Sequence, residues 1–217
     1  MPSPLRIAHR GMPRRAPENS LESFALALDA GADGIELDVH ATSDGVIVVH
    51  HDATLGTGEA IVDLTYQALL DRMAGGLHVA TLGEVRALVR DRAELFVEIK
   101  GSGIEQQVAD DLRDHPGRVA IHSFDHALIE RLSRISSLRL GVLLEFAEPA
   151  VAALMTRTGA LDVWPHHSLV DEGLVAAVHS AGGRVIPWTV NDSQEVARLV
   201  RLEVDGLCGD DVTAFPH

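Results

Sequence analysis

Nine short apolar runs alternate along this 217-residue chain with amphipathic stretches of helical period, and this alternation restricts the fold more than any other feature. Strands that alternate with helices are typical of a parallel α/β sheet. We expect the strands at Leu5–His9, Gly34–Val39, Val46–His51, Leu95–Lys100, Val119–Phe124, Leu138–Leu144, Leu161–Pro165, Arg184–Val190 and Val204–Cys208.

The third run does not fit a wholly parallel sheet. Only residues 40–45 separate it from the second run, whereas a parallel crossover needs a dozen or more residues. Asp44-Gly45 is a tight-turn dipeptide, so the third run should fold back antiparallel as a hairpin and return His51 toward the second strand. Eight parallel strands remain. We therefore predict a single TIM-type (β/α)8 barrel, one domain over residues 1–217, with a β-hairpin after the second strand.

Three of the expected helices have sharp start signals. The segments Asn19–Glu22, Thr81–Glu84 and Asp192–Glu195 each match a capping box or a close relative of one. The other helices are less sharply bounded, and we expect them around Thr65–Met73, Ala127–Leu132 and Gly173–Ser180.

Paired carboxylates carry the strongest chemical signal. Strand alternation turns Glu36 and Asp38 toward the barrel interior, because the apolar residues beside them must face the helices. Burying both charges is costly without compensation, which an Arg or Lys partner or a divalent metal could provide. The next barrel strand brings Glu98 beside them. Three acids favour one hard cation, Mg²⁺ or Ca²⁺, since zinc more typically uses His or Cys.

Lys100 is the only lysine in the chain, which otherwise uses arginine as its basic residue. It lies one step beyond Glu98 on the same strand face, nearer the C-terminal mouth where barrel enzymes hold their substrates. It is either a phosphate-binding point charge or a chance survivor of an arginine-preferring composition.

Two histidines are expected at the rim beside the acidic cluster. His9 ends the first strand and His51 ends the hairpin, so one ring can take a proton while the other donates one. Arg10 can clamp phosphate oxygens or simply pair with Glu18 or Asp52. We interpret His40, His50, His122, His166 and His167 as strand-end or supporting candidates, and His78, His115, His126, His179 and His217 as surface residues.

The net charge of −14 argues against nucleic acid as a partner and against docking on an anionic membrane. An anionic substrate must then be received locally, by a few cations or a metal. No run approaches the roughly 20 apolar residues needed to span a bilayer, so we expect no membrane insertion. Cys208 should be a small core residue, and a single cysteine without a signal peptide suits the cytoplasm.

Short motifs recur along nearly the whole chain: His9-Arg10-Gly11, Pro17-Glu18-Asn19-Ser20, Glu36 to Asp38, Asp44-Gly45, His51-Asp52, Glu98 to Lys100, Ser123-Phe124-Asp125, Trp188 to Asn191 and Val204 to Gly206. In the order and spacing of these motifs the chain resembles the glycerophosphodiester phosphodiesterase family. The resemblance implies an acid/base pair (His9 and His51), metal ligands (Glu36, Asp38 and Glu98), phosphate contacts (Arg10 and Lys100), a supporting Glu18 and a pocket-lining Trp188.

The chain departs from the family pattern at Gly56-Thr57, at Ala80-Thr81 and over 209–212, where Arg-Thr, Pro-Thr and Thr-Asp-Arg-Pro are typical. These departures leave the catalytic set intact. The implied reaction is metal-dependent hydrolysis of a small glycerophosphodiester to sn-glycerol 3-phosphate and an alcohol. The alternatives are a lysophospholipase D-like or lyase-type phosphodiesterase and a silent phosphate-ester binder. The sequence does not indicate which head-group alcohol is preferred, which histidine is the acid and which the base, whether a cyclic phosphate forms, or the oligomeric state.

Overall fold

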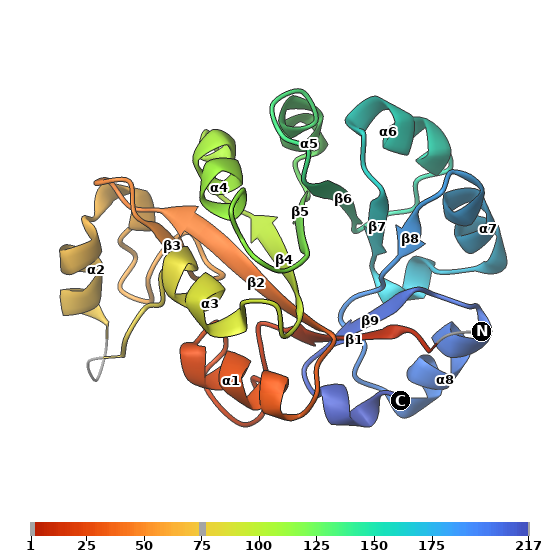
Figure 1. Cartoon of the computed structure of the whole chain (residues 1–217), viewed down its shortest axis with the longest axis horizontal. Coiled ribbons are helices and arrows are strands. Elements are labelled where there is room, and N and C mark those ends of the chain that lie inside the picture. The colour runs from red at the N-terminus through yellow and green to blue at the C-terminus, as the bar shows by residue number, and fades with distance from the viewer. Residues whose placement is uncertain (1–2, 74–76, 217) are drawn as a thin grey trace.

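The computed structural model describes residues 3–73 and 77–216. Eight parallel strands curve into a barrel whose outer surface is covered by helices (Figure 1). This arrangement confirms the predicted (β/α)8 fold. The barrel strands are β1 (Leu5–His9), β2 (Gly34–Ala41), β4 (Glu94–Ile99), β5 (Val119–Ser123), β6 (Arg139–Leu144), β7 (Asp162–Pro165), β8 (Arg184–Val185) and β9 (Gly206–Gly209).

The strand order is β8-β7-β6-β5-β4-β2-β1-β9, so each barrel strand lies beside its neighbour in the sequence. Between β8 and β9 the barrel is closed by single backbone bonds, from Asp205 N–H to Val185 O at 2.9 Å and from Cys208 N–H to Pro187 O at 3.1 Å. The predicted strand Arg184–Val190 is therefore wrong in length. Pro187 has no N–H to give to a ladder, and the regular strand ends before it.

The hairpin is present as predicted. The strand β3 (Ile47–Val49) pairs antiparallel with the end of β2, with Val39 opposite Val49. Gly45 turns the chain at a φ of +80°, a conformation that favours glycine. The hairpin carries the following chain away from the barrel, where α2 lies at the left of Figure 1.

The helices begin where side chains can cap them. Ser20, Thr81 and Asp192 accept hydrogen bonds from the first turns of α1 (Leu21–Asp29), α3 (Leu82–Val89) and α8 (Ser193–Arg201), and Thr81 forms a full capping box with Glu84. The remaining helices are α2 (Tyr66–Arg72), α4 (Glu105–Leu112), α5 (His126–Leu132), α6 (Val151–Thr158) and α7 (Glu172–Ser180), with short 3-10 turns η1 (Ile61–Asp63), η3 (His167–Leu169) and η4 (Val212–Ala214).

Side-chain alternation separates two apolar layers. Ile35, Leu37 and Val39 of β2 pack outward against the helices. A smaller cluster fills the barrel interior and includes Cys208, whose pKa is raised by burial. Cys208 is therefore the core residue that the sequence predicted. Glu36 lies on the inward face, so the site stands above an apolar floor.

The N-terminal end of the barrel is closed by a buried ion-pair network. Arg184 at the start of β8 contacts Glu94 of β4 at 2.8 Å and Asp162 of β7 at 2.7 Å. Both carboxylates are almost fully buried, and the pKa of Arg184 is raised by them against the effect of burial. This network stabilises the end of the barrel opposite the candidate site.

Candidate active site

Three buried carboxylates meet at the C-terminal ends of β2 and β4. Glu36, Asp38 and Glu98 are 3%, 1% and 7% exposed. The register places Asp38 beside Glu98, and it places Glu36 beside His9 of β1. Glu98 thus faces the barrel interior, as the strand alternation predicted.

Asp38 has cationic partners on both oxygens. Its Oδ2 lies 3.1 Å from Arg10 Nε and accepts a hydrogen bond from Asn19 Nδ2 at 2.9 Å. Its Oδ1 lies 3.3 Å from Lys100 Nζ. Burial acts to raise the pKa of Asp38, but the charges of Lys100 and Arg10 outweigh it and lower the pKa. The buried charge of Asp38 is therefore compensated by an Arg and a Lys, which is the alternative that the sequence left open to a metal ion.

The negative charges of Glu36 and Glu98 are less completely compensated by nearby cations. Glu36 Oε2 accepts a hydrogen bond from the backbone N–H of Arg10 at 3.1 Å. Glu98 Oε1 lies 2.9 Å from Lys100 Nζ, yet burial and the charge of Asp38 raise the pKa of Glu98 to about 8. A carboxyl group held in this way favours further positive charge nearby. The donor set therefore fits a divalent cation with hard oxygen ligands.

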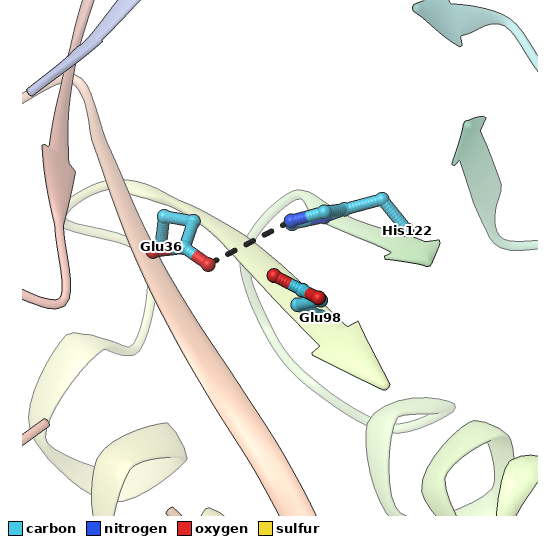
Figure 2. A group of neighbouring side chains, drawn as sticks. All are labelled: Glu36, Glu98 and His122. Atoms are coloured by element: carbon cyan, nitrogen blue, oxygen red, sulfur yellow. Dashed lines mark ion pairs between the residues drawn. The ribbon is translucent and has the colours of Figure 1, made fainter. Parts of the chain in front are cut away.

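Among the described residues, ligand atoms of Glu36, Glu98 and His122 all lie within 4.8 Å of one another, close enough to share one metal ion. In Figure 2 the two carboxylates of β2 and β4 face the ring of His122 on β5. The sequence predicted Asp38 as a metal ligand and His122 only as a strand-end or supporting residue. In the structure Asp38 contacts Arg10 and Lys100, and its role as a metal ligand stays a prediction.

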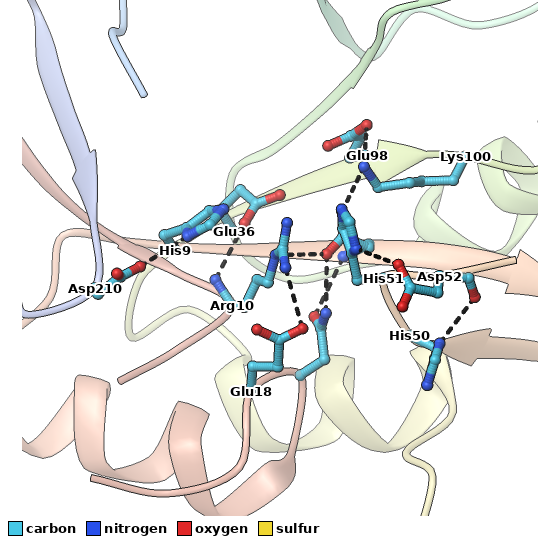
Figure 3. A network of polar contacts seen from close by, with 12 residues as sticks. His9, Arg10, Glu18, Glu36, His50, His51, Asp52, Glu98, Lys100 and Asp210 are labelled. Carbon is cyan, nitrogen blue, oxygen red and sulfur yellow. Dashed lines mark hydrogen bonds and ion pairs between the residues drawn. The ribbon is translucent and has the colours of Figure 1, made fainter. Parts of the chain in front are cut away.

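His9 is oriented from behind by a carboxylate. Its Nδ1 lies 2.9 Å from Asp210 Oδ1 (Figure 3), and Asp210 Oδ2 in turn accepts a hydrogen bond from Asn191 Nδ2 at 2.7 Å. Burial acts to lower the pKa of His9, but the bond to Asp210 and the charge of Glu36 outweigh it and raise the pKa. The ring is thereby fixed, with Nε2 left for a substrate.

His51 is held in the same manner from the hairpin side. Its Nδ1 lies 2.8 Å from Asp52 Oδ1. Its backbone carbonyl accepts a hydrogen bond from His40 Nε2 at 3.1 Å, and burial lowers the pKa of His40, which favours the neutral ring. The adjacent His50 N–H donates to Asp38 O at 3.0 Å, which ties the end of the hairpin to β2.

The turn after β1 explains the motif His9-Arg10-Gly11. Arg10 has a φ of 54°, which is uncommon for a residue with a side chain, and its N–H donates to Glu36 O at 3.0 Å. A Cβ on Gly11 would lie 2.3 Å from Ser23 Oγ, so a side chain does not fit there. This close packing against α1 directs the guanidinium of Arg10 into the site.

Arg10 and Lys100 are the cations that face the pocket. Arg10 Nη1 lies 3.0 Å from Glu18 Oε1, so Glu18 rather than Asp52 is its partner (Figure 3). Burial acts to lower the pKa of both cations, and the surrounding carboxylates, chiefly Asp38 for Arg10 and Glu98 for Lys100, raise it. Both side chains therefore stay charged beside the carboxylates.

Above these groups opens a pocket of about 290 Å³, close to the lower end of ordinary ligand sites. Trp188, expected to line it, lies in its wall, where Nε1 donates to Trp164 O at 2.9 Å. Its ring meets Phe124 edge-on, with centroids 5.4 Å apart. The polar part of the lining is His9, Arg10, Glu36, His51, Glu98, Lys100, His122, Glu145 and Thr189.

Sequence reasoning missed the role of Asp210. The sequence shows Asp210 only as part of an atypical chain end. Its contact with His9 has no local signal, because 201 positions separate the two residues. The usable signal was topological. β1 pairs with β9, with Ala8 opposite Gly209, so the residue after β9 must lie beside the residue after Ala8. Asn19, which binds Asp38, likewise has no sequence signal beyond its place in the motif Pro17-Glu18-Asn19-Ser20.

Two of the expected surface histidines are not at the surface. His115 is 9% exposed, because the chain after α4 turns back toward Arg86 and Arg90. His126 is half-buried, and its Nε2 donates to Leu143 O at 2.9 Å. His78 and His179 are exposed as predicted. His217 lies outside the described residues.

Comparison with known proteins places this geometry in one family. The model of the glycerophosphoryl diester phosphodiesterase family matches residues 9–214. A glycerophosphodiester phosphodiesterase from Caldanaerobacter subterraneus subsp. tengcongensis is 34% identical over 95% of this chain and 94% of its own length. One from Bacillus altitudinis is 30% identical over 94% and 93%.

The fold agrees with a solved relative. The crystal structure of a glycerophosphodiester phosphodiesterase from Thermotoga maritima has a TM-score of 0.85 and 27% identity, over 98% of this chain and 97% of that one. The family match spans every strand end that supplies the site described above, from His9 onward. The chain therefore belongs to the glycerophosphoryl diester phosphodiesterase family.

Proposed function

We propose that this phosphodiesterase hydrolyses a small glycerophosphodiester to sn-glycerol 3-phosphate and an alcohol, with one divalent cation, Mg²⁺ or Ca²⁺. The observation that carries the proposal is the pair His9 and His51. Each ring is oriented by a carboxylate, and both line one pocket with the buried Glu36 and Glu98. The relatives at 34% and 30% identity, which bear the name of this activity, support it.

Glu36, Asp38 and Glu98 are the proposed carboxylate ligands of the cation. Their burial and the raised pKa of Glu98 support a site that favours added positive charge. When bound, a divalent cation polarises a non-bridging phosphate oxygen and stabilises the negative charge that develops in the transition state. Carboxylate oxygens suit Mg²⁺ and Ca²⁺ equally by type.

The proton steps belong to the histidines. Because Nδ1 of each ring is bound to a carboxylate, Nε2 is the atom that meets the substrate. His51 accepts the proton of the attacking water or glycerol hydroxyl, and His9 donates a proton to the leaving alkoxide. The raised pKa of His9 supports its role as the acid, since it favours the protonated ring.

Charged and aromatic side chains at the mouth of the pocket position the substrate. Arg10 and Lys100 hold the phosphate oxygens, Arg10 through its planar fork and Lys100 as a point charge. Glu18 keeps Arg10 in place through the 3.0 Å contact at Nη1. Trp188 forms the apolar wall beside the substrate.

We further propose that residues 1–217 act as one cytoplasmic domain with a small-molecule substrate and no nucleic-acid partner. One nine-stranded sheet and the family match over 9–214 support a single domain. The net charge of −14 opposes binding to nucleic acid. Within the described residues, no helix has the length and apolar character needed to cross a membrane.

Product analysis tests the proposal. Glycerophosphocholine is incubated with the protein and Mg²⁺ or Ca²⁺, and the products are followed by ³¹P NMR. The expected product is sn-glycerol 3-phosphate, with free choline detected enzymatically. Accumulation of a cyclic glycerol phosphate as the end product would identify a lyase. Turnover of a lysophospholipid alone would identify a lysophospholipase D, and binding without turnover a silent phosphate-ester binder.

A further inference from the structure

His122 lies at the floor of the pocket without the contacts that a buried histidine usually has. It is 1% exposed, and its Nδ1 is buried without a hydrogen-bond partner among the described residues. Its Nε2 points toward the carboxylates and lies 3.7 Å from Glu36 Oε1, which is beyond hydrogen-bond distance (Figure 2). Among the described residues neither ring nitrogen therefore makes a hydrogen bond, and Nε2 is the one that faces the carboxylates.

The ring is held in place by packing. It stacks on Trp164 with centroids 4.4 Å apart and an interplanar angle of 10°. Gly141 on β6 leaves room for this pair, since a Cβ there would lie 3.1 Å from His122 Cβ and 3.0 Å from Trp164 Nε1. The β4–β5 register sets His122 directly beside Glu98. Nε2 is thus fixed in position and faces the carboxylate group.

We propose that His122 is a nitrogen ligand of the divalent ion held by Glu36 and Glu98. This inference rests on the proposed function, which requires such an ion. The ligand atoms of the three residues already lie within 4.8 Å of one another. A mixed oxygen and nitrogen set suits Mn²⁺, Co²⁺ or Zn²⁺, whereas Mg²⁺ and Ca²⁺ prefer oxygen alone. A nitrogen ligand therefore lets the site that is proposed to hold Mg²⁺ or Ca²⁺ bind a transition metal such as Mn²⁺ as well, and more tightly.

The competing explanation is a charged imidazolium that only neutralises Glu36. A charge-assisted hydrogen bond between the two would be about 2.7–2.9 Å long, and the observed 3.7 Å separation leaves that bond unmade. The separation instead leaves space between the nitrogen and the carboxylates.

The test uses metal-stripped full-length protein and four variants. His122→Gln offers an amide oxygen, His122→Phe keeps the ring stack without a ligand atom, and Trp164→Phe changes only the stacking partner. His126→Gln is the matched control, because His126 lies outside the pocket lining. Mn²⁺ and Mg²⁺ affinities are measured by titration calorimetry. Mn²⁺-loaded samples are examined by electron spin echo envelope modulation for a directly bound ¹⁴N nucleus.

We expect wild-type protein to bind Mn²⁺ more tightly than Mg²⁺ and to show ¹⁴N modulation. His122→Gln and His122→Phe should lose the modulation and weaken Mn²⁺ binding by about 10–100-fold, the range found for disturbed metal sites. In His122→Gln the Mg²⁺ affinity should change little. Trp164→Phe and His126→Gln should keep the ¹⁴N signal.

Absence of ¹⁴N modulation in wild-type protein would overturn the proposal even if no variant folds. Modulation that persists in both folded His122 variants would overturn it as well, as would equal loss of Mn²⁺ and Mg²⁺ binding in His122→Gln. Failure of the proposed function is distinguishable, because it would appear as absence of glycerophosphocholine turnover with any metal. Turnover with Mg²⁺ but without a bound nitrogen would reject only the role of His122.

Discussion

At the scale of single residues, the site depends on pairs in which one member orients the other. Asp210 holds His9 and Asp52 holds His51, each through Nδ1. Glu18 holds Arg10 in the same way. A side chain fixed by a neighbour needs little further ordering when substrate binds, so we expect these partners to affect the rate without touching the substrate.

The rate losses on replacing His9 and His51 should not be additive. Replacing His9 or His51 by Ala should lower the rate on glycerophosphocholine by about 10²–10⁴-fold each, the usual contribution of a positioned acid or base. The double variant should lose much less than the product of the two single losses, because the acid and the base act together in one catalytic unit. Wild-type activity in His51→Ala would contradict the proposed mechanism.

Asp210→Asn should lower the pKa of His9. The carboxylate favours the imidazolium through its hydrogen bond, so removing the negative charge leaves burial to favour the neutral ring. NMR titration of the His9 ring should show the midpoint move to lower pH, and the alkaline limb of the kcat/KM profile should move in the same direction. Asp211→Asn, two residues beyond Gly209, is the control and should leave both unchanged. An unchanged His9 midpoint in Asp210→Asn would show that Asp210 does not govern this proton.

Lys100 distinguishes phosphate binding from simple charge balance. If it binds phosphate, Lys100→Ala should raise KM and lower kcat/KM about tenfold or more, since a hydrogen bond to a charged group contributes ~1.5–3 kcal/mol. Metal affinity should hold or improve, because a cation is removed from beside Glu98 and Asp38. Lys100→Arg should not rescue the activity, because its longer planar group crowds a pocket already served by Arg10. Full activity in Lys100→Arg would reject the phosphate role.

At the scale of elements, local sequence signals located some helices and missed others. Ser20, Thr81 and Asp192 mark the starts of α1, α3 and α8 because their side chains cap the helix. The starts of α4 and α6 have Ile104 and Ala150 at the cap position, with no side-chain bond. Tertiary packing rather than a cap defines those helices, so their starts carry no comparable sequence signal.

The ion-pair network at the N-terminal end of the barrel should support stability but not chemistry. Arg184→Met removes the shared partner of the buried Glu94 and Asp162 and should destabilise the protein by about 3 kcal/mol, the lower end of the range for a broken buried pair. The lower end applies because Arg118 and Arg139 still reach these carboxylates. Denaturant unfolding measures the loss, and kcat of the folded variant should be unchanged.

Arg118→Ala is the matched control for that network. Its guanidinium contacts Glu94 at 3.3 Å, but the side chain is 74% exposed. An exposed pair of this kind contributes less than about 1 kcal/mol. Equal destabilisation by Arg118→Ala and Arg184→Met would contradict the view that burial, rather than contact, sets the cost.

At the scale of the whole molecule, the sequence predicted the barrel, the hairpin and the inward face of the carboxylates, because strand period and connection length are local properties. It did not predict the contact of Asp210 with His9 or the place of His122 beside Glu36. Those contacts depend on how the barrel closes and how β5 is staggered against β4. The length of β8 was also overestimated, since an apolar run does not reveal where Pro187 interrupts the ladder.

The proposed hydrolysis requires a divalent cation that the buried carboxylates hold. The most direct test is the initial rate on glycerophosphocholine for protein dialysed against EDTA, measured before and after Mg²⁺, Ca²⁺ or Mn²⁺ is restored. We expect at least about a hundredfold loss on removal, since a metal contributes several kcal/mol of transition-state stabilisation, and recovery that follows the metal-binding curve. A full rate in protein shown by elemental analysis to be free of metal would contradict the account.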